Sequence, residues 1–174
     1  MFILVALTGS VIVKAEDAGS IVCWGAIAFD TKQFDANDFI AISAGANYSI
    51  ALKSNGSIVS WGANNYGQAT PPSDSDFIAI SAGGFHSLAL KSDGSIVGWG
   101  YNEYGQTTPP VGNDFIAISA GYDPSLALKS DGSIIGWGDN YYGQATPLDG
   151  NDFVAISAGE SYSLALKSDG SIVG

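Results

Sequence analysis

A sequence unit of 38 residues recurs along the chain and limits the folds that the chain can adopt. The segment Phe39-Ile-Ala-Ile-Ser-Ala-Gly45 starts again at Phe77 and Phe115, and it returns with one Ile-to-Val change at Phe153. The successive offsets are all 38 residues. A fixed period of this size is typical of repeat proteins, in which each unit buries its apolar face against the next unit.

A more divergent copy precedes these four. A Gly-Ser-Ile motif starts at Gly19, and it returns in each of the later units, first at Gly56. Phe2 lies as far before Gly19 as Phe39 lies before Gly56. We therefore expect a single repeat domain over residues 1–174, with strand units at about 2–24, 39–61, 77–99, 115–137 and 153–174.

Each unit is predicted to form three antiparallel strands. In the third unit these are Phe77–Ala82, Ser87–Lys91 and Ser95–Trp99. Asp93-Gly94 between the last two is a strong hairpin signal, because glycine tolerates a positive φ. Along the strands, large aliphatic residues alternate with Ala and Ser instead of with charged residues. Small residues on the second face indicate that both faces are covered, as in radially packed sheets.

The composition agrees with a buried β protein and excludes several functions. Only 13% of the residues are charged, against about 25% in an average soluble domain. Six lysines and no arginine face 17 acidic residues, so the net charge is −11. Such a surface repels phosphate backbones, and we expect no direct binding of nucleic acid. The longest apolar run, residues 2–7, is much shorter than the roughly 20 residues of a membrane span.

The motifs of the third unit resemble those of a known repeat family. The run Ser81-Ala-Gly-Gly-Phe-His-Ser-Leu-Ala-Leu90, then Asp93-Gly94, Trp99-Gly100 and Tyr104-Gly-Gln106, is similar to a regulator-of-chromosome-condensation repeat. Each unit from Phe39 onward carries most of this pattern. The resemblance implies a β-propeller, usually of seven blades. The compact units look like those of bacterial members, including the propeller-type β-lactamase inhibitory protein.

We therefore predict an all-β fold, a β-propeller or partial propeller of about five three-stranded antiparallel blades. Seven blades of this size need more residues than the 174 given. We expect the chain to be a fragment of a larger propeller, a partner in an assembly, or a five-bladed ring.

Differences between the repeat copies gather in two segments. These are the loop between the first and second strands and the exit of the third strand, which a meander brings to one end of the sheet. They carry aromatic residues among small polar and acidic ones, and this mixture suits protein recognition, although exposed loops also drift. The candidate partner-binding residues are Asn47, Tyr48, Phe85, His86, Tyr101, Glu103, Tyr122, Asp123, Asp139, Tyr141, Glu160 and Tyr162.

Polar residues that recur unchanged between the clear copies are predicted to be structural, since they most often satisfy backbone groups in loops. They are Asn64, Asn102 and Asn140, Tyr66, Tyr104 and Tyr142, Gln68, Gln106 and Gln144, and the aspartates before each repeat Phe, Asp38, Asp76, Asp114 and Asp152. The pair Asp74 and Asp76 is only a weak signal for calcium.

No set of residues indicates catalysis. His86 is the single histidine, so no second imidazole can join it in an acid–base pair or a metal site. Cys23, the single cysteine, excludes a disulfide framework and takes a tight strand position, where we expect an inert packed thiol. We predict no catalytic residue, no metal and no cofactor.

The sequence thus predicts a non-enzymatic protein–protein interaction module. Its variable loop face is expected to bind a protein partner with a basic surface. Two alternatives stay open: a guanine-nucleotide exchange factor-like regulator of a small GTPase, implied by the resemblance, and a proteinaceous enzyme inhibitor that acts by occlusion.

Overall fold

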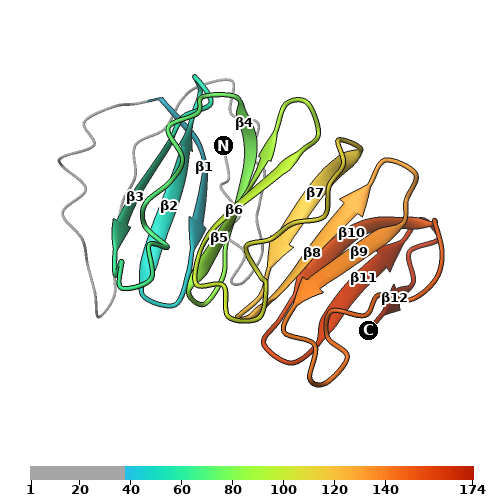
Figure 1. Cartoon of the computed structure of the whole chain (residues 1–174). Coiled ribbons are helices and arrows are strands. Elements are labelled where there is room, and N and C mark those ends of the chain that lie inside the picture. The colour runs from blue at the N-terminus through green and yellow to red at the C-terminus, as the bar shows by residue number, and fades with distance from the viewer. Residues whose placement is uncertain (1–37) are drawn as a thin grey trace.

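The computed structural model describes residues 38–174 as four sheets that follow one another along the chain (Figure 1). Each sheet has three antiparallel strands in sequence order, and we call the sheets blades 1 to 4. The strands are β1 Phe39–Ala44, β2 Tyr48–Lys53 and β3 Ile58–Gly62 in blade 1, β4 Phe77–Ala82, β5 His86–Lys91 and β6 Ile96–Gly100 in blade 2, β7 Phe115–Ala120, β8 Pro124–Lys129 and β9 Ile134–Gly138 in blade 3, and β10 Phe153–Ala158, β11 Ser163–Lys167 and β12 Ile172–Val173 in blade 4.

The all-β fold with three-stranded repeat blades is confirmed. The predicted strand Phe77–Ala82 is found unchanged, whereas β5 begins one residue earlier than predicted and β6 lies one residue later. The predicted unit at 2–24, with Cys23, lies outside the described residues, so the count of five blades and the single domain over 1–174 stay predictions. Among residues 38–174, no helix is long and apolar enough to cross a membrane.

The hairpin between the second and third strands depends on glycine for two reasons. Gly94 has a φ of 85°, a conformation that residues with a side chain rarely adopt. A Cβ atom on Gly94 would also lie 2.2 Å from the carbonyl oxygen of Asn113 in the connection to blade 3. Before this glycine, Asp93 Oδ1 accepts hydrogen bonds from the main-chain N–H of Ser95 at 2.9 Å and from its hydroxyl at 2.6 Å.

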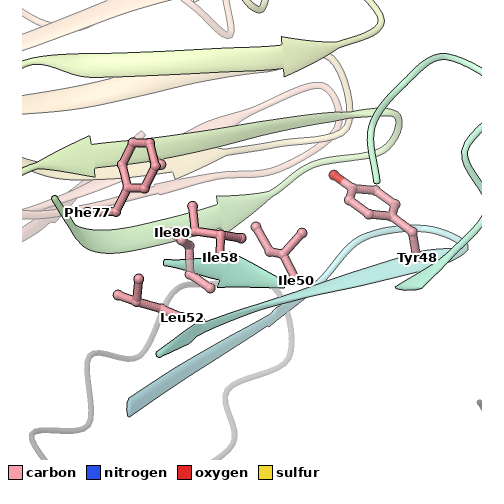
Figure 2. Close-up of a cluster of buried hydrophobic side chains, with 7 residues drawn as sticks. Tyr48, Ile50, Leu52, Ile58, Phe77 and Ile80 are labelled. Atoms are coloured by element: carbon pink, nitrogen blue, oxygen red, sulfur yellow. The ribbon is translucent and has the colours of Figure 1, made fainter. Parts of the chain in front are cut away.

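Neighbouring blades bury their apolar faces against each other. Ile80 of β4 packs in one cluster with Ile50, Leu52 and Ile58 of blade 1 (Figure 2). The same contact recurs between blades 2 and 3, where Ile118 joins a cluster with side chains of β5 and β6. The small Ala89 on the other face of β5 is also fully buried. Both faces of the sheet are therefore covered, as the alternation of large and small residues predicted.

The first strands of neighbouring blades also meet through polar and main-chain atoms. The hydroxyl of Ser43 accepts a hydrogen bond from the N–H of Ala82 at 3.0 Å, and the bond recurs from Ala120 to Ser81 and from Ala158 to Ser119, each at 2.9 Å. The glycine that follows each first strand lets the backbones approach closely, since a Cβ atom on Gly83 would lie 2.4 Å from the carbonyl oxygen of Gly121.

A buried histidine links blades 2 and 3. His86 is fully buried, its Nε2 lies 2.9 Å from Ser125 Oγ, and its Nδ1 has no hydrogen-bond partner. Burial lowers the pKa of His86 from 6.5 to about 4. The unfolded chain therefore binds this proton more readily than the folded protein, so stability is complete above pH 6.5 and falls as the pH drops toward 4.

We expect His86 to cost the protein about 2 kcal/mol of unfolding free energy between pH 7 and pH 5. The matched control is His86→Tyr, because Tyr48 holds the same position in blade 1 and has no proton to gain in this range. Urea unfolding at the two pH values measures the loss. Equal losses in the wild type and His86→Tyr would contradict this assignment.

Candidate functional site

The loop between the first and second strands lies beside the exit of the third strand. Main-chain hydrogen bonds join the two segments, from Tyr101 N–H to the Phe85 carbonyl at 2.9 Å in blade 2 and from Ala63 N–H to the Asn47 carbonyl at 2.8 Å in blade 1. The corresponding bond in blade 3 joins Asp139 to Asp123 at 3.3 Å. The variable segments therefore share one end of the blades, as the meander predicted, and we call this end the loop face.

Five aromatic rings from three blades contact one another on the loop face. Phe85 lies 5.4 Å from Tyr66 and 5.4 Å from Tyr122, measured between ring centroids, and Tyr101 lies 5.0 Å from Tyr66 and 6.2 Å from Tyr104. All of these pairs have edge-to-face geometry, which is a favourable arrangement of aromatic quadrupoles. We call these five residues the aromatic cluster.

Acidic side chains lie next to the aromatic cluster. The Tyr101 hydroxyl donates to Glu103 Oε2 at 2.5 Å, and this bond raises the pKa of Tyr101 to about 12. Asp123 accepts a hydrogen bond from Gln106 Nε2 at 3.3 Å. Partial burial, and then the nearby charges of Asp139 and Glu160, raise the pKa of Asp123. The loop face therefore carries mutually repelling negative charges beside exposed rings.

Two residues predicted for this surface belong to the contacts between blades. Tyr48 and His86 are 2% and 0% exposed, and they take the same place in their repeats. The Tyr48 hydroxyl donates to the His86 carbonyl and lies 2.9 Å from Ser87 Oγ. The prediction that they lie on an exposed face was wrong, because the side chain at this strand end points into the next blade.

Of the other ten predicted residues, one lies at the Tyr48 position of its repeat and nine lie in the loop segments. Tyr162 holds the Tyr48 position in blade 4 and is 64% exposed, on the side of that blade away from blade 3. Tyr141 is 82% exposed and pairs with Tyr142 at 4.8 Å. The loop segments thus hold Asn47, Phe85, Tyr101, Glu103, Tyr122, Asp123, Asp139, Tyr141 and Glu160, whose role in binding stays a prediction.

Sequence reasoning missed Tyr66 and Tyr104, which are 51% and 52% exposed members of the aromatic cluster. They were grouped with the constant polar residues because they recur in every copy. Their main-chain N–H groups have the expected structural role, that of Tyr66 donating to Gln68 Oε1 at 2.9 Å and that of Tyr104 to Gln106 Oε1 at 3.0 Å, whereas their rings do not. No sequence signal separated these rings from the structural residues of the same loop, because their contacts are made with residues of the variable segments.

The structural role of the constant Asn and Gln residues is confirmed. Asn102 Oδ1 accepts the N–H of Thr107 at 2.9 Å, and Asn102 Nδ2 donates to Thr108 Oγ1 at 3.2 Å. The main-chain carbonyl of Gln106 accepts the indole N–H of Trp137 in the next blade at 2.9 Å. These bonds close the loop after each third strand and tie it to the following blade.

At the opposite end, the repeat lysines pair with the aspartates before each Phe. Lys129 Nζ lies 2.8 Å from Asp114, and Lys91 lies 2.8 Å from Asp74 and 3.5 Å from Asp76. We predicted that the side chains of these aspartates bond the turn backbone. That prediction was wrong, because their main-chain carbonyls make this bond instead. Asp74 and Asp76 face an ammonium group, and no set of three potential metal ligands occurs within residues 38–174.

Comparison with known proteins identifies the repeat. Residues 39–68, 77–106 and 115–144, more than half of the chain, match the family model "Regulator of chromosome condensation (RCC1) repeat". No curated protein matches the chain significantly.

Several solved structures share the fold. The CRINKLY WD40 ectodomain of the Arabidopsis thaliana receptor kinase ACR4 is 23% identical with a TM-score of 0.73, covering 90% of this chain and 62% of its own. Yeast RCC1 (Prp20), in a structure with Kap60 bound, is 19% identical with a TM-score of 0.67, covering 80% and 43%. The ectodomain of the Physcomitrella patens receptor kinase CR4 is 24% identical with a TM-score of 0.65, covering 78% and 40%. The chain thus spans less than two thirds of the length of each of these proteins.

The different roles of Asn102 and Tyr104, which lie in the same loop after β6, can be tested. Asn102→Ala removes two loop-closing hydrogen bonds, and we expect it to lower the unfolding free energy by about 1 kcal/mol. Tyr104→Ala leaves the main-chain bond to Gln106 in place and removes a half-exposed ring, so we expect a change within about 0.5 kcal/mol. Urea unfolding of both variants measures the difference, and equal losses would contradict the division.

Proposed function

Because the chain belongs to the regulator of chromosome condensation (RCC1) repeat family, we propose that it is a non-enzymatic protein-interaction module that binds a basic partner at its loop face. The aromatic cluster is the observation that carries this proposal. Three of its rings, Phe85, Tyr101 and Tyr122, come from the segments that differ most between copies, and the five rings lie together although blades 1, 2 and 3 each supply part of them.

The geometry of the cluster supports recognition of a protein. Tyrosine rings provide a large contact area with few rotatable bonds, and they are enriched among the residues that dominate binding energy at interfaces. Phe85 and Tyr101 are held by a main-chain hydrogen bond between their loops and by ring contacts on both sides. A surface that is ordered in advance loses less entropy when a partner binds.

The charges of the loop face favour a basic partner. Repulsion from Asp139 and Glu160 contributes to the raised pKa of Asp123, so a cation placed opposite these carboxylates relieves an existing repulsion. The acidic side chains are already engaged within the surface, Glu103 by Tyr101 and Asp139 by Gln144 Nε2 at 2.7 Å. This arrangement supports binding rather than general acid–base chemistry.

The yeast proteins suggest suitable probes. One structure of this fold, Prp20p from Saccharomyces cerevisiae at 24% identity, has a title that names its binding to Gsp1p and histones. Histones are a useful probe for the present chain because they test the proposed preference for a basic partner. Faster nucleotide release from a small GTPase in the presence of the chain would instead favour the exchange factor-like alternative.

We expect purified histones to bind the wild-type chain in biolayer interferometry, and the double variant Phe85→Ala/Tyr101→Ala to bind at least about tenfold more weakly, or about 1.4 kcal/mol. The control is Val111→Ala, which removes a fully exposed apolar side chain outside the aromatic cluster. Circular dichroism establishes that both variants are folded. Unchanged binding by the folded double variant would overturn the role of the aromatic cluster, and no binding by the wild type would overturn the basic partner.

The same interaction is expected to depend on pH through Asp123. Its pKa lies above the ordinary 3.8, so this carboxylate begins to bind protons at a higher pH than an unperturbed aspartate. Affinity for a basic partner therefore weakens as the pH falls through that pKa. Asp123→Asn serves as the control, because binding by this variant should lose this part of the pH dependence, whereas an identical pH profile would contradict the contact.

A further inference from the structure

The end of the blades opposite the loop face shows how this chain holds its own cations. The ammonium group of Lys91 lies 5.6 Å from the ring centroid of Phe77 and 2.8 Å from a carboxylate oxygen of Asp74. The same arrangement recurs in blades 1 and 4. A ring attracts a cation through its quadrupole and a carboxylate attracts it through its charge, so the two together form a cation site.

The loop face carries the same two components around Tyr101. The half-exposed rings of Tyr66 and Tyr104 lie 5.0 Å and 6.2 Å from the Tyr101 ring, measured between centroids. The Tyr101 hydroxyl donates to Glu103. After this bond and partial burial, the charges of Glu103 and Asp123 add to the rise in the pKa of Tyr101. Two half-exposed rings thus contact Tyr101, and two carboxylates from neighbouring blades act on it.

No residue between 38 and 174 supplies a cation to the aromatic cluster. The lysines in this range all pair with aspartates at the opposite end of the blades; they are Lys53, Lys91, Lys129 and Lys167. Arginine is absent from the whole sequence. The rings and carboxylates of the loop face are therefore open to a cation that a partner brings.

Of the two cationic side chains, arginine fits this surface better than lysine. Its planar guanidinium stacks on an aromatic face, and its five N–H donors bond carboxylates in a fixed geometry, whereas the lysine ammonium is a strongly hydrated point charge. Each carboxylate here uses one oxygen within the chain, since Glu103 Oε2 accepts from Tyr101 and Asp123 Oδ1 accepts from Gln106 Nε2. The second oxygen of each carboxylate can accept an N–H of the guanidinium.

We propose that the aromatic cluster binds an arginine side chain of the partner, with the guanidinium stacked on the ring of Tyr104 and hydrogen-bonded to Glu103. Asp123 of the next blade adds a second negative charge on the same surface. The inference rests on the proposed function, because it names the side chain that the loop face recognises. The partner is therefore a protein segment that exposes arginine rather than lysine.

Fluorescence anisotropy with labelled oligo-arginine and oligo-lysine peptides of equal length tests the preference. We expect oligo-arginine to bind the wild-type chain at least about tenfold more tightly, because the two peptides carry the same charge and differ in the group that stacks. Equal affinities would overturn the arginine site and leave the basic partner of the proposed function in place. Binding of neither peptide would overturn both.

Matched variants test where the arginine binds. Tyr104→Leu removes the ring but keeps an apolar side chain, and we expect it to reduce the preference for oligo-arginine by about fivefold. The control is Tyr142→Leu, because Tyr142 takes the same repeat position in blade 3, is 70% exposed and lies outside the aromatic cluster. Circular dichroism establishes that both variants are folded. An unchanged preference in Tyr104→Leu, or an equal loss in Tyr142→Leu, would overturn the assignment.

Discussion

The close approach of main chains between neighbouring blades determines the rest of the structure. A side chain on Gly121 would place its Cβ 2.1 Å from the carbonyl oxygen of Gly159, and Gly83 stands in the same relation to Gly121 at 2.4 Å. Because the backbones approach closely here, the serine of each first strand accepts a hydrogen bond from an N–H of the next blade. The aliphatic side chains of the two blades are thereby aligned for packing. These contacts use main-chain atoms and constant residues, so the side chains of the variable loops are free to differ.

Most of this framework was predictable because each of its signals is local and repeated. The period located the blades, Asp93-Gly94 located a hairpin, and the alternation of Ile and Leu with Ala and Ser indicated that both sheet faces are covered. Antiparallel geometry alone was enough to place the loop of Phe85 beside the exit of Tyr101. The repeat unit predicted before residue 38 lies outside the described residues and stays a prediction.

The side chains that were misplaced are those whose direction depends on another blade. Tyr48 and His86 differ between copies and flank a loop, which favours a surface position, yet both point into the neighbouring sheet. Tyr66 was classed as structural because it is constant, although its ring contacts Phe85 of the next blade. Comparing the repeat copies shows whether a residue is constant or variable at its position in the repeat. The comparison does not show which neighbouring repeat its side chain contacts.

The residues at the Tyr48 position also make the three described interfaces unequal. Tyr48 makes two hydrogen bonds to blade 2 and His86 makes one to blade 3, whereas Pro124, at the same place in blade 3, has no side-chain donor for blade 4. In a linear array, each unit is held mainly by its neighbours, so opening begins at the weakest junction. Of the three described junctions, the one between blades 3 and 4 is therefore the one that opens with the smallest loss of side-chain hydrogen bonding at this position.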